Sequence, residues 1–243
     1  MTSRFVRFAL SISLSSAIVS SGIAFASGFA LIEQGVSGLG NAYAGGAAVA
    51  QDGSTIFYNP AGMTRLPSQF IAAANVIVPN FTFKNEGSTQ LLQPLTGVPL
   101  LGGNGGDAGV TKAVPNLYYV QKINDQIFFG LGINSPFGLT TEYDQGWAGR
   151  YYAVKSELLT ININPSIAYR FNEQFSFGAG LNISYIKADL SSAIDFGTIG
   201  FGAPGLTPQG NDGFVELKGD SWGVGWNVGL LYEFTKSTRI GIA

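Results

Sequence analysis

Apolar and polar residues alternate along three long segments in the second half of the chain. In residues 159–171 the odd-numbered positions are apolar or aromatic, whereas most even-numbered positions are Thr, Asn or Ser. Residues 175–185 alternate in the same way, and in residues 222–234 the even-numbered positions are the apolar ones; Gly, Ser and Asn fill most of the other positions in both segments. Because successive side chains of a β-strand point to opposite faces, this period of two predicts strands with one apolar and one polar face.

Weaker alternation and turn signals extend the pattern over most of the remaining chain. The weaker segments are residues 70–83, 114–123 and 127–133, with a further one beginning near Thr238. Long connections are expected at residues 84–112 and 191–214, and short turns at Asn124-Asp125 and Asn172-Glu173. Such alternation of short and long connections is typical of a barrel with one rim in the periplasm and the other outside the cell.

Alternation also suits a soluble β-sandwich, in which the apolar face packs against a second sheet. Three features favour a membrane barrel. The clear segments are about a dozen residues long, enough for a tilted strand to cross a bilayer, whereas soluble strands average about five or six residues. Aromatic residues gather beside the turns, as at Tyr169, Phe171 and Phe175, and the second face carries few charges. The predicted fold class is therefore all-β, an antiparallel transmembrane β-barrel.

A transmembrane barrel has to close, because an open sheet edge in hydrocarbon leaves backbone polar groups without hydrogen bonds. About six to seven strands are expected in residues 67–243, fewer than the roughly eight strands of the smallest bacterial barrels. We therefore expect residues 67–243 to be the N-terminal half of a barrel that is truncated at its C-terminus. The alternative is an oligomer in which several chains complete one barrel.

The first residues have the pattern of a secretory signal peptide. Arg4 and Arg7 precede a run of apolar or small residues, 8–25, and Ala24-Phe25-Ala26 places small residues where a signal peptidase cuts. A membrane-spanning helix is the alternative, but several Ser residues interrupt the run. The prediction is a signal peptide at residues 1–26 and export of the mature chain.

The segment after the signal peptide differs in composition from the strand region. Residues 27–66 are rich in Gly, Ala and Ser and contain neither sustained alternation nor a long run of good helix formers. Short helices and turns are therefore expected there.

Composition removes several classes of function. The 243 residues include 13 Lys and Arg against 15 Asp and Glu, so the chain lacks the basic surplus expected of a nucleic-acid-binding protein. There is no Cys and no His, which excludes disulfides, thiolate metal sites and the imidazole that serine, cysteine and zinc hydrolases need. A carboxylate-pair enzyme remains the alternative. We expect no enzyme activity, no metal site and no cofactor.

Six short motifs lie along the chain: SGLGNAYAG at residues 37–45, STIFYNPAGM at 54–63, VPN at 114–116, SPFGL at 135–139, KSEL at 155–158 and WGVGWN at 222–227. In this order and spacing they resemble the FadL/TodX (OMPP1) family of outer-membrane channels for hydrophobic compounds. The resemblance covers nearly all of the chain after the signal peptide. An ordered series of matches is far more specific than any single motif.

The resemblance implies a barrel of about fourteen strands, plugged by an N-terminal hatch that here corresponds to residues 27–66. It also implies passive uptake of long-chain fatty acids or other hydrophobic compounds through the outer membrane of a Gram-negative cell. In the family the substrate reaches a pocket inside the barrel and leaves sideways through the wall beside a kinked third strand, without ATP or metal.

Two alternatives stay open: an aromatic-hydrocarbon channel of the same family, and a secreted β-sheet binding protein without a pore. The resemblance also implies that the complete protein is a monomer that contacts hydrophobic small molecules and outer-membrane lipid.

Two motifs are the expected functional segments. Ser135-Pro136-Phe137-Gly138 interrupts the alternating residues 127–141, since Pro removes a backbone donor from a strand and Gly permits unusual backbone angles. The resemblance makes this the kink that opens the wall, and an ordinary strand end is the alternative. Asn59-Pro60-Ala61 matches the hatch motif of the family, although Asn-Pro by itself only signals a turn.

Four residues are candidates for substrate binding. Phe29, at the start of the hatch, and Phe137 and Leu139, beside the kink, are expected from the resemblance to line the pocket. Where the fatty-acid transporter that gives the family its name has an arginine for the carboxylate, this chain has Ser192. The nearest cation is Lys187, the fourth candidate, which is expected either to replace that arginine or to be an ordinary charge of the lumen or rim.

Overall fold

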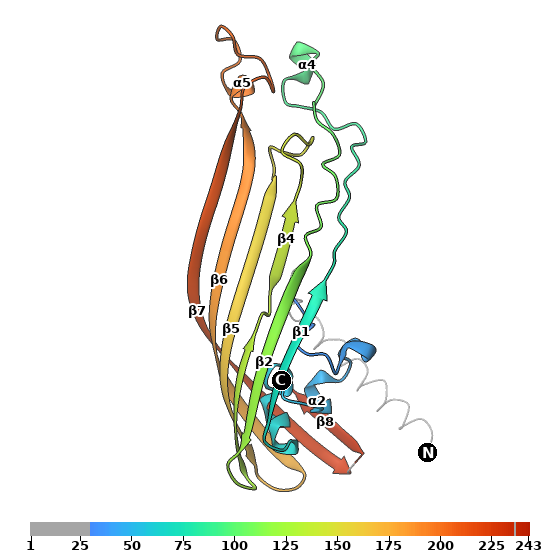
Figure 1. The fold of residues 1–243 in the computed structure, drawn as a ribbon, viewed down its shortest axis with the longest axis vertical. Coiled ribbons are helices and arrows are strands. Elements are labelled where there is room, and N and C mark those ends of the chain that lie inside the picture. Colours follow the sequence, from blue (N-terminus) through green and yellow to red (C-terminus); the bar gives the residue numbers. More distant parts are fainter. Residues whose placement is uncertain (1–29, 236) are drawn as a thin grey trace, which may run out of the picture. The chain divides into compact units, whose positions relative to one another are not determined.

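One antiparallel sheet of eight strands accounts for most of the fold (Figure 1). The computed structural model describes residues 30–235 and 237–243, so the expected signal peptide and Phe29 lie outside the described residues. The strands are β1 (Gln69–Ile77), β2 (Lys112–Lys122), β3 (Ile127–Asn134), β4 (Gly138–Glu142), β5 (Lys155–Arg170), β6 (Phe175–Asp195), β7 (Asp212–Thr235) and β8 (Thr238–Ile242). Their order is β1-β2-β3-β5-β6-β7-β8, and β4 also pairs with β5.

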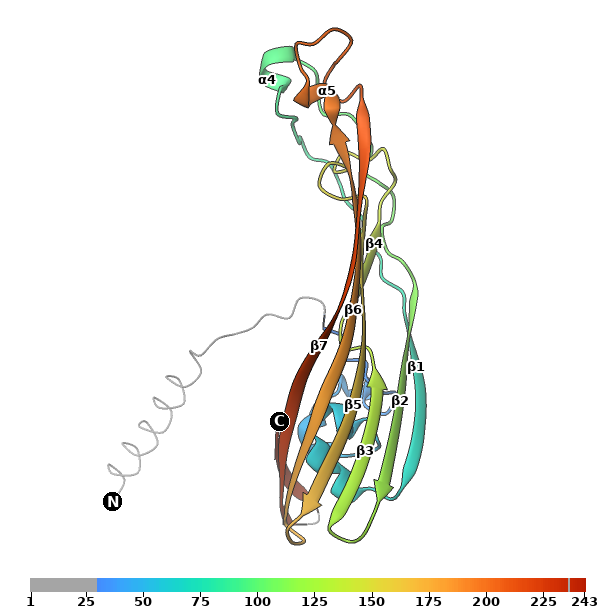
Figure 2. The ribbon, with the colours of Figure 1, turned by 90° about the vertical axis from the view of Figure 1, so that its left-hand side faces the viewer.

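The sheet curls around a group of short helices and forms part of a barrel wall (Figure 2). The predicted antiparallel barrel fold is confirmed. Among the described residues, all these strands belong to the one sheet, and outward side chains stay exposed, with Trp226 at 73% and Val224 at 79%. The β-sandwich alternative, which would bury such side chains between two sheets, is wrong.

The outward face carries an apolar band between two rows of aromatic side chains. The lower row includes Phe171, whose ring stacks on that of Phe175 with 5.3 Å between centroids. The upper row contains Tyr185 and Trp222, which lie opposite each other with ring centroids 5.1 Å apart. Ile161 lies opposite Tyr185 in the upper row, and Phe171 in the lower row is about ten residues further along the chain. At about 3.3 Å per residue and a strand tilt of about 40°, the two rows are about 25 Å apart along the membrane normal. This is the height of the lipid-facing band of outer-membrane barrels.

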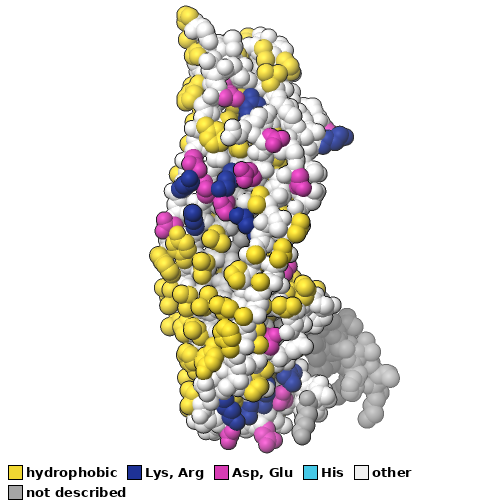
Figure 3. Space-filling model, in the orientation of Figure 1, with side chains coloured by type: hydrophobic (Ala, Val, Ile, Leu, Met, Phe, Trp, Pro, Cys, Tyr) yellow, Lys and Arg dark blue, Asp and Glu magenta, His cyan; other side chains and the backbone are white. Residues whose placement is uncertain are grey.

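Charged residues begin directly above the upper aromatic row. Lys187 lies opposite Asp220, and Asp189 lies opposite Lys218, on the outward faces of β6 and β7. Together with Lys155 and Glu157 of β5 and Glu216 of β7, these residues are named the charged band. Figure 3 shows apolar side chains over the middle of the sheet and charged ones above them. The strands therefore continue beyond the level of the hydrocarbon.

The inward face carries buried amide side chains, which form hydrogen bonds with one another across the strands. Asn162 donates hydrogen bonds from its side chain to Asn134 at 3.2 Å and to Asn182 at 3.0 Å. The side chain of Asn164 donates to that of Asn227 at 3.1 Å. Buried polar groups need such partners, and this network explains the polar half of the alternating pattern.

Residues 31–66, for which the name hatch is kept as a label, contain four short helices, which lie against the inward face of the sheet. They are η1 (Leu39–Asn41), α2 (Gly46–Val49), α3 (Thr55–Tyr58) and η2 (Pro60–Arg65). Ile56 and Met63 are fully buried in a core with Tyr118 of β2 and Phe128 of β3. The approach to β6 is closest at Gly178, where a Cβ would overlap the backbone of Pro60 and Ala61. A side chain larger than hydrogen at this position would displace the hatch.

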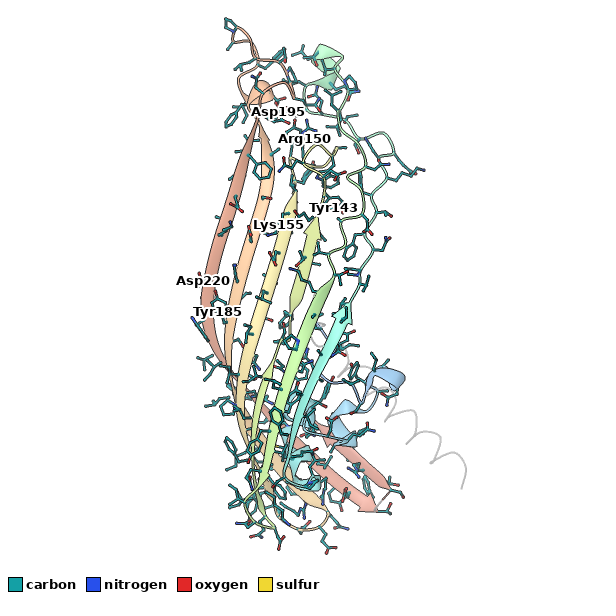
Figure 4. The ribbon with its side chains drawn as sticks, viewed as in Figure 1. Tyr143, Arg150, Lys155, Tyr185, Asp195 and Asp220 are labelled. Atoms are coloured by element: carbon teal, nitrogen blue, oxygen red, sulfur yellow. The ribbon has the colours of Figure 1, made fainter. Side chains whose placement is uncertain are left out.

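Long connections at the opposite end of the sheet hold two further helices, α4 (Gln93–Thr96) and α5 (Phe196–Ile199) (Figure 1). Arg150, labelled in Figure 4, is buried among these connections. Its guanidinium pairs with Asp212 at 2.7 Å and donates to the carbonyl oxygen of Leu101 at 2.8 Å. Arg150 therefore joins the connection between β4 and β5 to the connection between β1 and β2 and to the first residue of β7. In the described part of the chain, no helix is both long and apolar enough to cross a membrane.

Candidate functional site

The third strand of the predicted barrel is divided into β3 and β4 by the segment Ser135–Phe137, named the break. Asn134 lies opposite Asn162 of β5, and Gly138 lies opposite Leu159. From residue 134 to residue 138 the third strand advances by four residues, whereas β5 advances by three, from 162 to 159. One extra residue on one of two paired strands is the geometry of a β-bulge. Pro136 fits this position because it has no backbone N–H to offer a neighbouring strand.

Thr160 of β5 holds the break in place on one side. Its hydroxyl accepts a hydrogen bond from the backbone N–H of Phe137 at 2.9 Å and donates to the carbonyl oxygen of Phe137 at 2.6 Å. The hydroxyl of Ser135 donates to the carbonyl oxygen of Thr160 at 2.7 Å. Both backbone groups of Phe137 thus have a side-chain partner in place of a strand partner.

Backbone pairing stops on the other side of the break, toward β2. The ladder between β2 and β3 ends at the pair Leu117 and Ile133, and the next bridge along the same register joins Gly109 to Thr141. Between these points, no backbone pairing joins the two strands among the described residues. This stretch, with residues 110–116 on one side and 134–140 on the other, is named the window.

A cavity of about 400 Å³ lies at the window. Most of its lining is apolar and comes from β1, β2, β3, β4 and β5, together with the chain that leads from β1 to β2 and Leu31 of the hatch. Three expected site residues line it: Ser135, Gly138 and Leu139. A cavity in this size range is typical of a binding site for a small ligand.

The first described residues of the hatch close against the break. The backbone N–H of Leu31 donates to the carbonyl oxygen of Pro136 at 2.9 Å, and the side-chain amide of Gln34 donates to that of Ser135 at 2.9 Å. Gln34 is fully buried, and its backbone carbonyl oxygen accepts a hydrogen bond from the hydroxyl of Tyr118 at 2.8 Å. The carbonyl groups of Ser135 and Pro136, which lie in the break, therefore have hydrogen-bond donors in the hatch.

An ion-pair network borders the cavity at the level of the charged band. The ammonium group of Lys112 pairs with Glu157 at 2.9 Å, and that of Lys155 pairs with the same carboxylate at 2.8 Å. Lys155 also pairs with Asp189 at 2.9 Å. Lys155 is labelled in Figure 4, above Tyr185. Charge thus appears at one level of an otherwise largely apolar cavity.

The motif Asn59-Pro60-Ala61 lies away from the cavity and anchors the hatch to β7. The buried side-chain amide of Asn59 donates to the carbonyl oxygens of Ala47 at 2.6 Å and Leu230 at 2.9 Å. Its side-chain oxygen accepts from the N–H of Ala61 at 3.0 Å and so caps η2. The motif has a structural role in fixing the hatch inside the wall.

Two expected binding residues do not line the cavity. Phe137 is partly exposed at the break, and Lys187 lies on the outward face opposite Asp220. Phe29 lies outside the described residues. Sequence reasoning missed Leu31, Gln34, Thr160 and Lys112, because their roles depend on which distant segments the fold brings beside the break.

The described residues, 30–235 and 237–243, contain no cluster of side chains that could bind a metal ion. No group of three or more His, Cys, Asp or Glu side chains there is close enough to hold an ion. What the cavity offers is an apolar lining with polar groups at the break and one charged edge. Such a lining suits a largely apolar ligand.

Comparison with known families gives one match over nearly the whole chain. Residues 17–243 match the family model described as outer membrane protein transport protein (OMPP1/FadL/TodX). A long-chain fatty acid transport protein of Escherichia coli O6:H1 is 37% identical over 231 residues, covering 90% of this chain and 50% of that protein. Outer membrane protein P1 of Haemophilus influenzae is 32% identical over 261 residues, covering 98% of this chain and 57% of that protein. The chain therefore spans about half the length of these relatives.

Solved structures give the same picture of the fold. A FadL homologue of Pseudomonas aeruginosa superimposes with a TM-score of 0.67 at 26% identity, covering 86% of this chain and 50% of that one. The toluene transporter TbuX of Ralstonia pickettii superimposes with a TM-score of 0.52 at 20% identity, covering 80% of this chain and 52% of that one. At this lower identity, the second likeness concerns the fold alone.

Proposed function

The chain belongs to the outer membrane protein transport protein family (OMPP1/FadL/TodX), and from this premise we propose that it serves, within a complete barrel, passive uptake of long-chain fatty acids or other hydrophobic compounds. The family consists of outer-membrane transporters rather than enzymes. Members of the family are located in the outer membrane of Gram-negative bacteria. The proposal concerns the substrate and the route it takes.

The observation that carries the proposal is the cavity at the window. It lies where the backbone pairing between β2 and the third strand is interrupted, and it borders the outward apolar band. A ligand there has a short path to the hydrocarbon of the bilayer. We therefore propose that the window is the lateral exit.

The energy of hydration favours this route over an aqueous one. Each CH₂ group moved from an apolar environment to water costs about 0.8 kcal/mol, so a chain of about fifteen such groups costs about 12 kcal/mol. A path through the wall avoids most of this cost because the chain passes directly from an apolar cavity to lipid. Passive transport then needs only a concentration gradient, with no ATP and no metal.

An interrupted wall is tolerable in lipid only if the freed backbone groups keep partners, since each unsatisfied group costs several kcal/mol there. Thr160 bonds both backbone groups of Phe137, while Gln34 and Leu31 bond the carbonyl groups of Ser135 and Pro136. These contacts support a break that is built into the wall. The alternative of an ordinary strand end is less consistent with the strand resuming as β4.

Fatty acids are the first candidate substrates because several relatives, among them one at 37% identity and one at 35%, are named long-chain fatty acid transport proteins. Aromatic hydrocarbons are the second, since the cavity lining would accept them and TbuX shares the fold. The alternative of a secreted binding protein without a pore is set aside, because the family belongs to the outer membrane.

Uptake measurements test the proposal. The complete gene is expressed in a Gram-negative strain that lacks its own fatty-acid uptake protein, and import of radiolabelled oleate and of toluene is measured separately. We expect import of oleate above that of the empty vector. A variant without residues 59–61 serves as the control that should lose the gain. Import of toluene alone would favour the second candidate, and import of neither compound by a correctly inserted protein would contradict the proposal.

A further inference from the structure

Three arginine side chains and one carboxylate lie together at the end of the sheet that carries the short turns. They belong to Arg65 of the hatch, Arg170 of β5, Arg239 of β8 and Glu233 of β7. We propose that the three arginines, named the arginine cluster, bind a soluble oxyanion of the phosphate class and that the bound anion fastens the hatch to the wall. This site is separate from the window and does not depend on the proposed function.

The register of the strands places the arginine cluster on the inward face. Arg170 lies opposite Ser176 of β6, and Glu233 lies opposite Arg239. Ser176 is fully buried, and its hydroxyl oxygen accepts a hydrogen bond from the guanidinium of Arg65 at 3.4 Å. Figure 2 shows the helices of the hatch inside the curl of the sheet, near the short turns. Because such turns face the periplasm in outer-membrane barrels, the ligand comes from the periplasm and not from lipid.

Positive charge exceeds negative charge at this place. The carboxylate of Glu233 is shared between Arg65 and Arg239, each at 3.3 Å. Charge-assisted hydrogen bonds are about 2.7–2.9 Å long, so neither contact is a strong one. In the described part of the chain, no carboxylate lies within ion-pair distance of Arg170. Three positive charges against one negative charge leave a surplus of two.

Two donors of the arginine cluster lack an acceptor. The Nε–H groups of Arg65 and Arg170 are buried, and no acceptor among the described residues lies within hydrogen-bond distance of either. The side chain of Arg65 keeps only 13% of its surface exposed, and the guanidinium of Arg170 lies over the ring of Phe128, 5.3 Å from its centroid. Buried donors in folded proteins are normally paired with protein groups, water or ions. An anion in the arginine cluster would supply acceptors where the wall supplies too few.

A phosphate-class oxyanion matches both the charge and the donors. A guanidinium is planar and holds its five N–H donors in a fixed fork, which fits two oxygen atoms of one anion. A phosphate group carries about −1.5 to −2 charges near pH 7, close to the surplus of the arginine cluster. A chloride ion carries one charge and has no pair of oxygen atoms for the fork. Phosphate should therefore be preferred over chloride.

The bound anion would join parts of the fold that are distant in sequence. Arg65 is the last residue of η2, and the guanidinium of Arg239 donates to the carbonyl oxygen of Val49, the last residue of α2, at 3.2 Å. Arg170 and Arg239 both repel the charge of Arg65. An anion shared by the three side chains replaces this repulsion by attraction. Because a ligand stabilises the state that binds it, phosphate should hold the hatch in place.

Two measurements on the purified full-length protein in detergent test the inference. Isothermal titration calorimetry measures the Kd of inorganic phosphate near pH 7, with the ionic strength held constant by sodium chloride. Limited proteolysis measures the rate at which residues 31–66 are cut, with phosphate or with chloride at the same ionic strength. We expect phosphate to bind and to slow the cleavage, and chloride to do neither.

Three variants make the result specific. Arg170→Gln should raise the Kd of phosphate about tenfold, because a charged donor group is lost, and phosphate should no longer slow the cleavage. Glu233→Gln removes the carboxylate that competes with the anion and should lower the Kd. Lys84→Gln makes the same change of charge as Arg170→Gln at an exposed lysine between β1 and β2, and it should leave the Kd unchanged.

Three results would overturn the inference: no binding of phosphate by the folded wild type, equal protection of the hatch by phosphate and chloride, or wild-type affinity in Arg170→Gln. The first would mean that carboxylates elsewhere in the complete barrel balance the arginine cluster. Loss of the heat-dependent gel mobility of a folded barrel identifies a variant that fails to fold. If Arg170→Gln fails in this way, Arg239→Gln takes its place with the same expected result. Import of oleate bears on the proposed function alone.

Discussion

The side-chain amide of Gln34 donates a hydrogen bond to the carbonyl oxygen of Ser135 at 2.9 Å, joining residues that are 101 positions apart in the chain. One belongs to the start of the hatch, and the other to the break in the third strand. The contact is buried, and the same amide nitrogen also donates to the carbonyl oxygen of Leu31 at 2.8 Å. Hatch and wall are therefore coupled at the place where the wall lacks backbone pairing.

Replacing Gln34 should destabilise the hatch against the wall. Gln34→Ala leaves the carbonyl group of Ser135 without this donor, which costs about 1–3 kcal/mol for a buried group. We expect a lower midpoint of urea unfolding for the full-length protein. Gln174→Ala, at an exposed turn position, is the matched control and should not shift the midpoint. Equal midpoints for Gln34→Ala and the wild type would show that the contact is energetically unimportant.

Replacing Thr160 should loosen the break itself. Thr160→Val keeps the shape of the side chain but removes the hydroxyl that bonds both backbone groups of Phe137, at a cost of about 1–3 kcal/mol. Hydrogen exchange measured by mass spectrometry should become faster in peptides that contain residues 135–138. Thr160→Ser retains the hydroxyl and should keep the protection. Unchanged exchange in Thr160→Val would mean that other contacts hold the break.

A methyl group on β6 should push the hatch out of place. In Gly178→Ala the new Cβ would overlap the backbone of Pro60 and Ala61, and backbone cannot move aside as a flexible side chain can. Overpacking of this kind costs about 1–3 kcal/mol or more. Limited proteolysis of the full-length protein should cleave the hatch faster than in the wild type. Gly223→Ala, which has open space around its Cβ position, should be cleaved at the wild-type rate.

Acid should release the connection between β1 and β2. The backbone N–H groups of Gly109 and Phe81 each donate to the Asp107 carboxylate at 2.9 Å, and these hydrogen bonds hold the pKa of Asp107 below its usual value. A lowered pKa in the folded protein means that the stabilising contribution is complete above the usual value, about 3.9, and is lost as the pH falls through the folded value.

Hydrogen exchange in residues 78–111, corrected for the intrinsic effect of pH, measures this release. It should rise between pH 6 and pH 3 in the wild type. Asp107→Asn should show fast exchange at both values, because its neutral side chain accepts these bonds less strongly. A wild-type profile without pH dependence would exclude Asp107 as the group responsible.

Much of the wall was predictable from alternation, because burial against the hatch and exposure to lipid impose opposite requirements on the two faces. The three clearest predicted segments became the C-terminal parts of β5 and β7 and the N-terminal half of β6. Their ends were wrong: β6 continues to Asp195 and β7 begins at Asp212, inside the connection expected at residues 191–214. Above the hydrocarbon the outward positions carry Lys187 and Lys218, so the strands persist where the apolar period has ended.

The first predicted segment was too long for a different reason. Residues 70–83 were expected to form one strand, but β1 ends at Ile77. Pro79 follows two residues later and has no backbone N–H for a ladder. The prediction weighed the apolar pattern of this segment above the constraint that proline sets.

The candidate site was only partly predictable. Ser135, Gly138 and Leu139 belong to a motif and were found, whereas Lys112 is the end residue of a weak strand and had no local signal. Its partner Glu157 is 45 positions away, and only the register of the sheet brings the two together. Lys187, the cation that the sequence suggested, is far from Lys112 in the sequence and points outward from β6, away from the cavity.

The bulge at the break also changes the phase of the third strand. Ile133 lies opposite Ile163 on the outward face, but Leu139 lies opposite Leu158, which belongs to the inward set of β5. Two odd-numbered residues of one strand thus point to opposite sides of the membrane wall. Cysteine probes placed along this strand would have to be interpreted in two frames: odd positions up to residue 133 report on lipid, and odd positions from residue 139 report on the interior.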